Sequence, residues 1–236
     1  MILIIIIILI DKLILRTNEM KKNNQLTIFP SAIPLEMCYR VIELGETLDF
    51  YPGKVSTETG PEIIMGSRQD NIALIPSNPS TSWIYDEMWE IIKELNRRNW
   101  QFELNAIETL QYSTYHEGHF FGWHRDNVPA FYRKLKNAST EITRKLTISV
   151  QLSDPNEYVG GHFEVNQNET GDEESDNQAD ASPRSGELDL TDLVSPRGTI
   201  TAFPSVFRHR VSPIRKGTRR SLVAWAGGPP ADYDSY

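Results

Sequence analysis

The sequence predicts a mainly β fold with flanking helices, and three features support this. From Phe102 onward the chain consists of short apolar runs separated by turn residues, which is typical of a β-sandwich or barrel. Two segments before Phe102 instead place apolar residues at helical spacing. The chain of 236 residues is long enough for one substantial core but short for two enzyme domains. We therefore expect a single domain at residues 25–236.

Residues 1–24 are interpreted as an N-terminal extension of this domain. Met1 to Ile10 is an unbroken apolar run, whereas a membrane-spanning helix takes about 20 residues. A secretory signal would have a basic segment before the apolar run and small residues after it, and neither is visible. We expect a cytoplasmic protein without membrane association, and a weak anchor or signal in this extension stays open. Cys38 is the only cysteine, which excludes an intramolecular disulfide.

Two helices are predicted before the β-rich part. The first is expected to begin near Ser31, with Pro34 in its first turn, and to end by Gly45. The second is expected to run from a cap at Ser80 or Ser82 to about residue 98. Its apolar face would carry Ile84, Met88, Ile91, Ile92 and Leu95. Residues 49–79 are rich in Gly, Pro, Ser and Asn, which predicts loops with one short strand at 72–75.

The β-rich part contains several short runs that we predict to be strands. They are 102–115, 119–124, 145–152, 162–165, 199–203, 208–211 and 219–226. The run at 145–152 alternates cleanly between apolar and polar side chains. Leu146, Ile148, Val150 and Leu152 face one way, whereas Thr147, Ser149 and Gln151 face the other. We expect the first face to join the core and the second to line a cavity.

The net charge of −8 comes from one segment, residues 166–196. This segment contains nine acidic residues against the single base Arg184, which accounts for the whole excess of eight. Because it has almost no apolar residues before Leu188, we interpret it as a solvated acidic insertion. The remainder of the chain is formally neutral, so the low pI does not exclude an anionic substrate. A basic cluster near the C-terminus lacks interleaved aromatic residues, and it gives no strong nucleic-acid signal.

Two distant histidines and one aspartate form a candidate metal site. His124 and Asp126 are two residues apart at the end of a predicted strand, so both can face one ion while Arg125 points away. His209 on another predicted strand would complete a set of two histidines and one carboxylate, which suits iron(II) oxygenases because it leaves three positions open. Arg219 follows ten residues later across a turn, where its guanidinium could bind the distal carboxylate of 2-oxoglutarate.

These residues lie within motifs that resemble the prolyl 4-hydroxylase-like family of iron(II) and 2-oxoglutarate dependent oxygenases. The matching pieces are Tyr115 nine residues before His124, the sequence 124–127, Gly160-Gly161-His162-Phe163, Phe203-Pro204-Ser205 after Gly198, and residues 209–225. The resemblance spans roughly residues 104–228. The chain departs from the family in its acidic insertion, which is longer than the usual connection. It also carries Phe121 where many relatives have tyrosine, so a hydroxyl role there is lost.

The resemblance implies a double-stranded β-helix, or jelly-roll, core with an N-terminal helical supporting layer. It implies that His124, Asp126 and His209 bind Fe(II), that Arg219 binds the C5 carboxylate of 2-oxoglutarate, and that Tyr115 lines the same pocket. Ascorbate is a further cofactor that it allows for. The implied reaction uses molecular oxygen to hydroxylate an aliphatic C–H, with release of succinate and carbon dioxide. A peptidyl prolyl or other protein side chain is the first choice of substrate.

Several alternatives stay open at this point. A free amino acid or another small molecule is a second substrate class, and a β-helix binding module without catalysis is a different functional class. Tyr115 could be an ordinary core tyrosine. His116 and His119 are interpreted as surface residues, because three residues apart on a strand they would face opposite sides. Arg220 should point away from the site that Arg219 faces.

Overall fold

The fold is described from a computed structural model, which covers residues 26–57, 60–64, 66–127, 133–134, 141–166 and 194–230. The predicted extension at 1–24 lies outside these residues. So does most of the predicted acidic insertion, of which only 166 and 194–196 are described. Within the described ranges, no helix has both the length and the apolar character needed to cross a bilayer.

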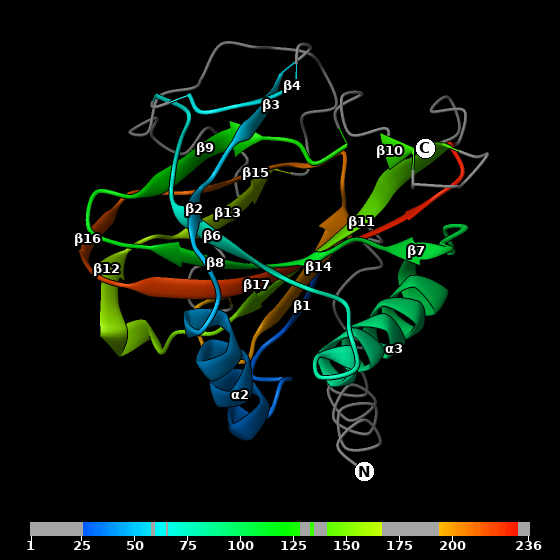
Figure 1. Cartoon of the computed structure of the whole chain (residues 1–236), viewed down its shortest axis with the longest axis horizontal. Coiled ribbons are helices and arrows are strands. Elements are labelled where there is room, and N and C mark those ends of the chain that lie inside the picture. The colour runs from blue at the N-terminus through cyan, green and yellow to red at the C-terminus, as the bar shows by residue number, and fades with distance from the viewer. Residues whose placement is uncertain are drawn as a thin grey trace.

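The larger sheet has nine strands and is the main element of the fold (Figure 1). Its strands follow the order β1 (Thr27–Phe29), β14 (Ile200–Pro204), β11 (Glu141–Gln151), β17 (Arg219–Gly228), β8 (Leu110–Tyr115), β6 (Asn71–Ile75) and β2 (Tyr51–Pro52). Two short strands extend it, because β10 (Arg133–Lys134) pairs with β11 and β7 (Ala106–Ile107) pairs with β17. Every pairing in this sheet is antiparallel.

A second, four-stranded sheet lies over one face of the larger sheet, in the order β13 (Phe163–Asn166), β15 (Arg208–Val211), β9 (Phe120–His124) and β5 (Arg68–Gln69). Two small two-stranded sheets complete the β structure. They pair β12 (Tyr158–Gly160) with β16 (Ile214–Gly217) and β3 (Val55–Thr57) with β4 (Gly60–Glu62). The short 3-10 helix η2 (Pro155–Glu157) precedes β12. The prediction of a mainly β fold is therefore confirmed.

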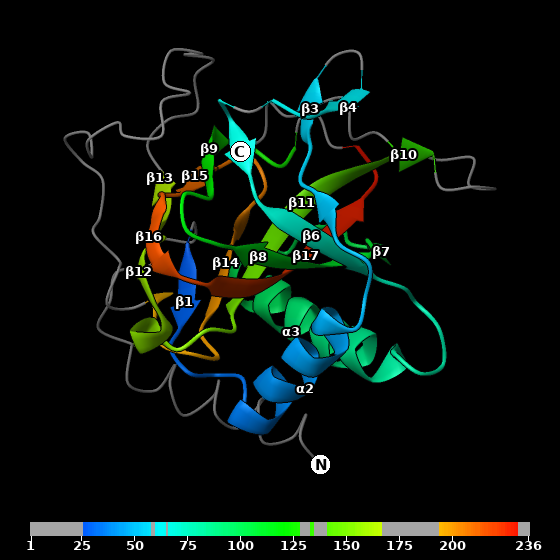
Figure 2. The same ribbon diagram turned by 60° about the vertical axis from the view of Figure 1, so that its left-hand side comes forward.

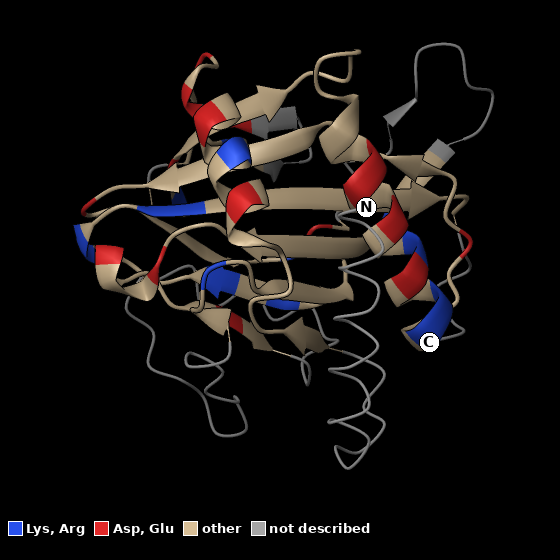
Figure 3. Cartoon of the chain, turned by 90° about the horizontal axis from the view of Figure 1, so that it is seen from below, with Lys and Arg blue, Asp and Glu red and all other residues tan. Residues whose placement is uncertain are grey.

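Helices α2 (Leu35–Glu46) and α3 (Ser82–Asn99) cover the opposite face of the larger sheet (Figures 1 and 2). The first helix begins four residues later than predicted, because Ser31 has φ 52 and Pro34 stands just before the first turn. The predicted caps of the second helix are also wrong, because its N-cap is Thr81. The hydroxyl of Thr81 instead bonds to the carbonyl of Pro76. The solvent side of α3 carries charges of both signs (Figure 3), including the ion pair of Lys93 with Glu90.

The alternation in β11 divides the interior as the sequence predicts. Leu146, Ile148 and Val150 join the main hydrophobic core with the buried faces of α2 and α3. Thr147 lies on the other side of the strand and bonds to Asp126, which follows β9 of the second sheet. The polar face of β11 is therefore turned toward the space between the two sheets.

The predicted β runs each contain a strand, and the run at 72–75 becomes β6. The sequence did not reveal eight strands, each of two to four residues: β1, β2, β3, β4, β5, β10, β12 and β16. Alternation over so few residues has no recognisable period, and such strands form because a neighbouring strand offers hydrogen bonds.

The contact between α2 and β8 gives a stability prediction. A Cβ on Gly45 would lie 2.5 Å from ring atoms of Tyr112, whose hydroxyl is held by Glu46 at 2.9 Å. We expect Gly45→Ala to lower the free energy of unfolding by about 1–3 kcal/mol, since overpacking outweighs the higher helix propensity of alanine. Gly66→Ala is the control, because a Cβ there meets nothing within 4 Å. Equal denaturant midpoints for the two variants would contradict the prediction.

Candidate metal centre

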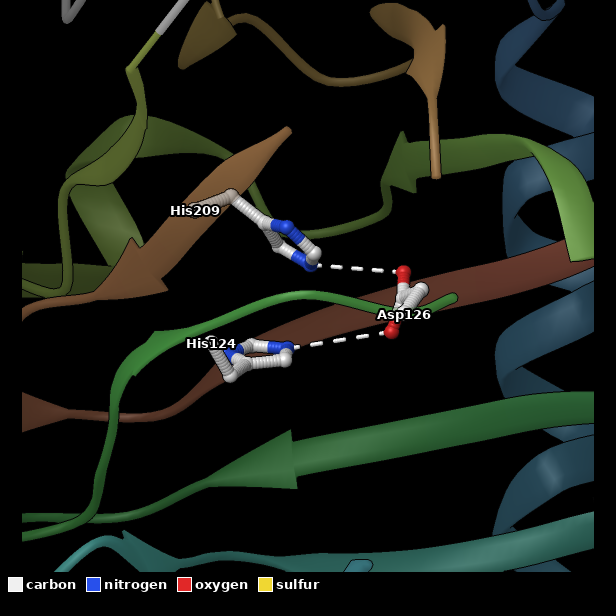
Figure 4. A group of neighbouring side chains, drawn as sticks. All are labelled: His124, Asp126 and His209. Atoms are coloured by element: carbon white, nitrogen blue, oxygen red, sulfur yellow. Dashed lines mark ion pairs between the residues drawn. The ribbon is translucent and has the colours of Figure 1, made fainter. Parts of the chain in front are cut away.

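The two histidines of the candidate site are direct cross-strand neighbours. His124 ends β9, and His209 is the residue opposite it on the antiparallel strand β15. Opposed residues of an antiparallel pair project to the same face. The two imidazole ring centroids accordingly lie 4.1 Å apart, with both rings directed toward Asp126 (Figure 4).

Asp126 is held in place by the larger sheet. Its backbone N–H donates to the carbonyl of Ser205 at 3.0 Å, which fixes the loop after β9 against the turn after β14. The Thr147 hydroxyl on β11 donates to Oδ2 of Asp126 at 2.8 Å and lies 2.9 Å from the Ser205 hydroxyl. Since Thr147 has a single proton to donate, Ser205 is the donor in the second bond. The carboxylate therefore takes its orientation from side chains that the second sheet does not supply.

Backbone carbonyls fix the protonation pattern of both imidazoles. Nδ1 of His124 lies 2.9 Å from the carbonyl of Gly122, and Nδ1 of His209 lies 3.1 Å from that of Phe207. A carbonyl can only accept, so Nδ1 of each ring carries a proton. Burial, followed by the neighbouring His209, holds the pKa of His124 well below its ordinary value. Nε2 of His124 thus presents a lone pair, as a metal ligand must.

The three ligand atoms converge on one point. Nε2 of His124 lies 3.8 Å from Oδ1 of Asp126, Nε2 of His209 lies 3.4 Å from Oδ2, and all three donors are within 4.8 Å of one another (Figure 4). A lone pair that faces a carboxylate is unfavourable without a cation between them. Metal–ligand bonds of about 2.0–2.2 Å would fit between these atoms after a small contraction. The donor set therefore fits a divalent cation such as Fe(II).

The carboxylate of Asp126 stays ionised in this buried position. Burial alone would raise its pKa, but the nearby His209, His124 and Arg144 together lower the pKa to about 2. Nη1 of Arg144 lies 3.9 Å from Oδ1 of Asp126. Glu108 holds the same guanidinium through contacts of 2.6 and 2.8 Å. At neutral pH the carboxylate is therefore charged and available to a cation.

Arg219 and Tyr115 are opposed residues of β17 and β8, and both are buried. The guanidinium carbon of Arg219 lies 5.6 Å from the ring centroid of Tyr115 and 5.9 Å from that of Phe163. The ring of Phe163 is in turn 5.9 Å from the ring of His209. Phe163 therefore lies close both to Arg219 and to His209, one of the three candidate ligands.

Arg219 has no counter-ion among the described residues. Arg219 is 3% exposed, and no ion pair or hydrogen bond joins its side chain to another of the described residues, where the rings of Tyr115 and Phe163 lie nearby. Arg220, the next residue, points to the opposite face and donates from Nε to Oε1 of Glu46 on α2 at 2.9 Å. The predicted direction of Arg220 is confirmed.

The sequence interpretation of His116 and His119 was wrong. His116 and His119 were expected to face opposite sides of a strand, but they lie in the turn between β8 and β9. Gly118 has φ 81 in this turn, and the two rings come to 5.3 Å in an edge-on contact. His116 is nevertheless exposed, as expected of a surface residue.

The sequence did not identify Thr147, Ser205 or Arg144 as neighbours of Asp126. Alternation placed Thr147 on the polar face of its strand and gave no partner for it. Only the register of β11 against β14, which pairs Thr147 with Phe203, brings Ser205 within reach. The structure thus adds these three side chains to the ligands that the sequence predicted.

A family model, the 2OG-Fe(II) oxygenase superfamily, matches residues 110–227. The chain belongs to this superfamily. It is 23% identical over 184 residues to a PKHD-type hydroxylase of Synechococcus elongatus, covering 76% of this chain and 68% of that protein. A PKHD-type hydroxylase of Acinetobacter baumannii is 25% identical over 203 residues, covering 83% of this chain and 75% of the relative.

Solved structures show the same fold. A prolyl-4-hydroxylase of Pseudomonas putida superposes with a TM-score of 0.56 at 17% identity, over 94% of this chain and 98% of that one. A prolyl hydroxylase of Trichoplax adhaerens, in complex with a peptide fragment, superposes with a TM-score of 0.57 at 13% identity. The match covers 92% of this chain and 88% of that one. The expected jelly-roll core and the prolyl 4-hydroxylase-like family are confirmed. The chain is an oxygenase, and its family implies the use of Fe(II) and 2-oxoglutarate.

The bond from Thr147 to Asp126 gives a prediction for metal binding. We expect Thr147→Val to weaken Mn(II) binding by about tenfold or more, because partners that orient a ligating carboxylate contribute that much to affinity. The matched control is Ser149→Ala, two residues along the same face of β11. Ser149 is also buried, and no hydrogen bond joins its side chain to another described residue. Titration with Mn(II) under anaerobic conditions measures the affinity of both variants. Equal Mn(II) affinities would exclude an orienting role for Thr147.

Proposed function

We propose that this protein is an Fe(II)- and 2-oxoglutarate-dependent dioxygenase that hydroxylates an aliphatic C–H of a peptidyl prolyl or other protein side chain. In this proposal His124, Asp126 and His209 hold the iron. Arg219 binds the C5 carboxylate of 2-oxoglutarate, and Tyr115 lies beside it. The products are the hydroxylated substrate, succinate and carbon dioxide.

The observation that carries the proposal is the combination of the three convergent donors with the buried guanidinium of Arg219. A buried cation without a counter-ion is costly, and an anionic ligand removes that cost. A dicarboxylic keto acid can interact with Arg219 and with the metal site at the same time. One carboxylate would pair with Arg219 in the bidentate geometry that a guanidinium favours, and the keto acid end would reach the metal ligands.

The protein's own groups bind, orient and exclude water. The carbonyls of Gly122 and Phe207 accept hydrogen bonds from Nδ1 of His124 and His209, which keeps these nitrogens protonated. The Thr147 hydroxyl donates its proton to the carboxylate of Asp126. Apolar rings, including those of Phe163 and Phe203, form a cluster around His209 that excludes water. Bound Fe(II) supplies oxygen activation coupled to the oxidative decarboxylation of 2-oxoglutarate.

A protein substrate is favoured by the relatives. The curated relatives are named PKHD-type hydroxylases, and one of the similar solved structures holds a peptide fragment. A free amino acid or another small molecule, hydroxylated by the same mechanism, is the second candidate. A requirement for ascorbate stays a prediction, to be tested by omitting it from the assay.

Succinate release tests the proposal and separates the substrate classes. Iron-loaded protein is offered proline-containing peptides, free amino acids and oligonucleotides in parallel, with mass spectrometry of each product. We expect release coupled to a gain of one oxygen atom with peptides. His124→Ala, Asp126→Ala and His209→Ala should each abolish turnover, since three protein ligands leave none to spare. Full activity of any of these variants in a folded, iron-supplied form would refute the assigned ligand set.

The role of Arg219 is tested against its neighbour. We expect Arg219→Ala to raise the KM for 2-oxoglutarate roughly 10- to 150-fold, because a charge-assisted pair contributes about 1.5–3 kcal/mol. Arg220→Ala is the matched control, since this arginine pairs with Glu46 on the helix side. Its KM should stay within about twofold of the unmodified value. A larger effect for the Arg220 variant would mean that the carboxylate binds elsewhere.

A further inference from the structure

We propose that Arg68 and Phe121 are positioning residues for His124, forming a stacked column that holds the imidazole in its metal-binding orientation. The inference rests on the proposed metal site. It concerns side chains on β5 and β9 that are not themselves among the three candidate ligands.

The column consists of three flat groups in succession. The rings of Phe121 and His124 are nearly parallel, with an interplanar angle of 10° and centroids 3.5 Å apart. The guanidinium carbon of Arg68 lies 4.3 Å from the centroid of Phe121. Arg68 and Phe121 are opposed residues of β5 and β9, so the strand pairing itself sets this contact.

A β-bulge in β9 makes the stacking possible. Residues three apart on a regular strand point to opposite faces, as Phe121 and His124 otherwise would. Here Val211 pairs with Phe121 while His209 pairs with His124, so two steps on β15 match three on β9. The extra residue turns both aromatic rings to the same face. Bulges of this kind are known to redirect side chains next to active sites.

Arg68 is itself held rigidly. Its Nε and Nη2 donate to the two oxygens of Asp70 at 2.7 and 2.8 Å, and its Nη1 donates to the carbonyl of Lys54 at 2.9 Å. The side chain of Arg68 is 8% exposed and that of Asp70 is 0% exposed. Gly53 packs against this pair so closely that a Cβ would lie 1.8 Å from Oδ1 of Asp70.

Packing alone does not account for this arrangement. A buried ion pair is weak evidence for stability, because apolar residues of similar volume often serve as well. The guanidinium of Arg68 contacts the ring of Phe121, which stacks on a candidate metal ligand, and the ring of His209 lies 4.1 Å from the same imidazole. The single hydrogen bond from Nδ1 to Gly122 leaves the tilt of the ring undetermined, whereas the stack restricts it. Side chains that orient a metal ligand typically change metal affinity by about 10- to 100-fold when they are replaced.

The first test replaces the ring. Mn(II) affinity is measured anaerobically from the electron paramagnetic resonance signal of the free ion, so no turnover is needed. We expect Phe121→Leu to weaken Mn(II) binding by about tenfold. Phe121→Tyr retains the stacked ring, and its affinity should stay within about twofold of the unmodified protein. Thermal unfolding of the metal-free variants separates loss of fold from loss of orientation.

The second test replaces Arg68 together with its ion-pair partner Asp70. Arg68→Met combined with Asp70→Asn avoids leaving a buried carboxylate without its counter-ion, and we expect weaker Mn(II) binding here too. In the Phe121→Leu background the same pair of substitutions should add less than about twofold, because Arg68 acts through the ring. The control is Arg40→Met, which removes a guanidinium 4.0 Å from the ring of Trp83 at the surface between α2 and α3. It should leave Mn(II) affinity unchanged.

The outcomes distinguish this inference from the proposed function. If His124→Ala binds Mn(II) as tightly as the unmodified protein, the metal site itself is wrong, and the column loses its role with it. If His124→Ala loses binding while Phe121→Leu keeps it, only the column is refuted. Equal losses for the leucine and tyrosine variants, or full additivity with the Arg68 substitutions, would also overturn it.

Discussion

The antiparallel register of β9 and β15 is the constraint on which the site depends. It sets His124 opposite His209, and the hydrogen bonds between the two strands fix this pairing. A slip of one residue would move one histidine to the other face of the sheet. The bulge on β9 adds a second condition, because it brings Phe121 behind the imidazole of His124. The ligand geometry is thus a property of strand pairing rather than of the side chains alone.

The site joins the two sheets. Both histidines belong to the second sheet, whereas Asp126 takes its hydrogen bonds from Thr147 and Ser205 on and beside strands of the larger one. All three donors are carried by β9, the loop after it and β15, but the bonds that orient the carboxylate form only where the larger sheet packs against them. Arg144 contributes a positive charge 3.9 Å from the same carboxylate, which helps keep it ionised despite its burial. Packing and charge therefore act on the same group.

The sequence predicted the features that depend on local periodicity. Alternation correctly divided β11 into a core face and a polar face, and it separated Arg219 from Arg220. Features that depend on register or on turns could not be predicted in this way. His116 and His119 were misjudged because strand alternation was applied across a turn, where it does not hold. The column behind His124 was hidden for a related reason, since a spacing of three residues normally places side chains on opposite faces.

Adjacent arginines in β17 show how the same residue type takes different roles on the two faces of a strand. Arg220 faces the helices, where Glu46 provides both a hydrogen bond and a counter-charge. Arg219 faces the interior, where the described residues surround it with the rings of Tyr115 and Phe163. Aromatic faces attract a cation but do not satisfy its N–H donors. The proposed role of Arg219 in binding an anion depends on this difference, because an arginine that is paired like Arg220 would have to break that pair before it could bind an anion.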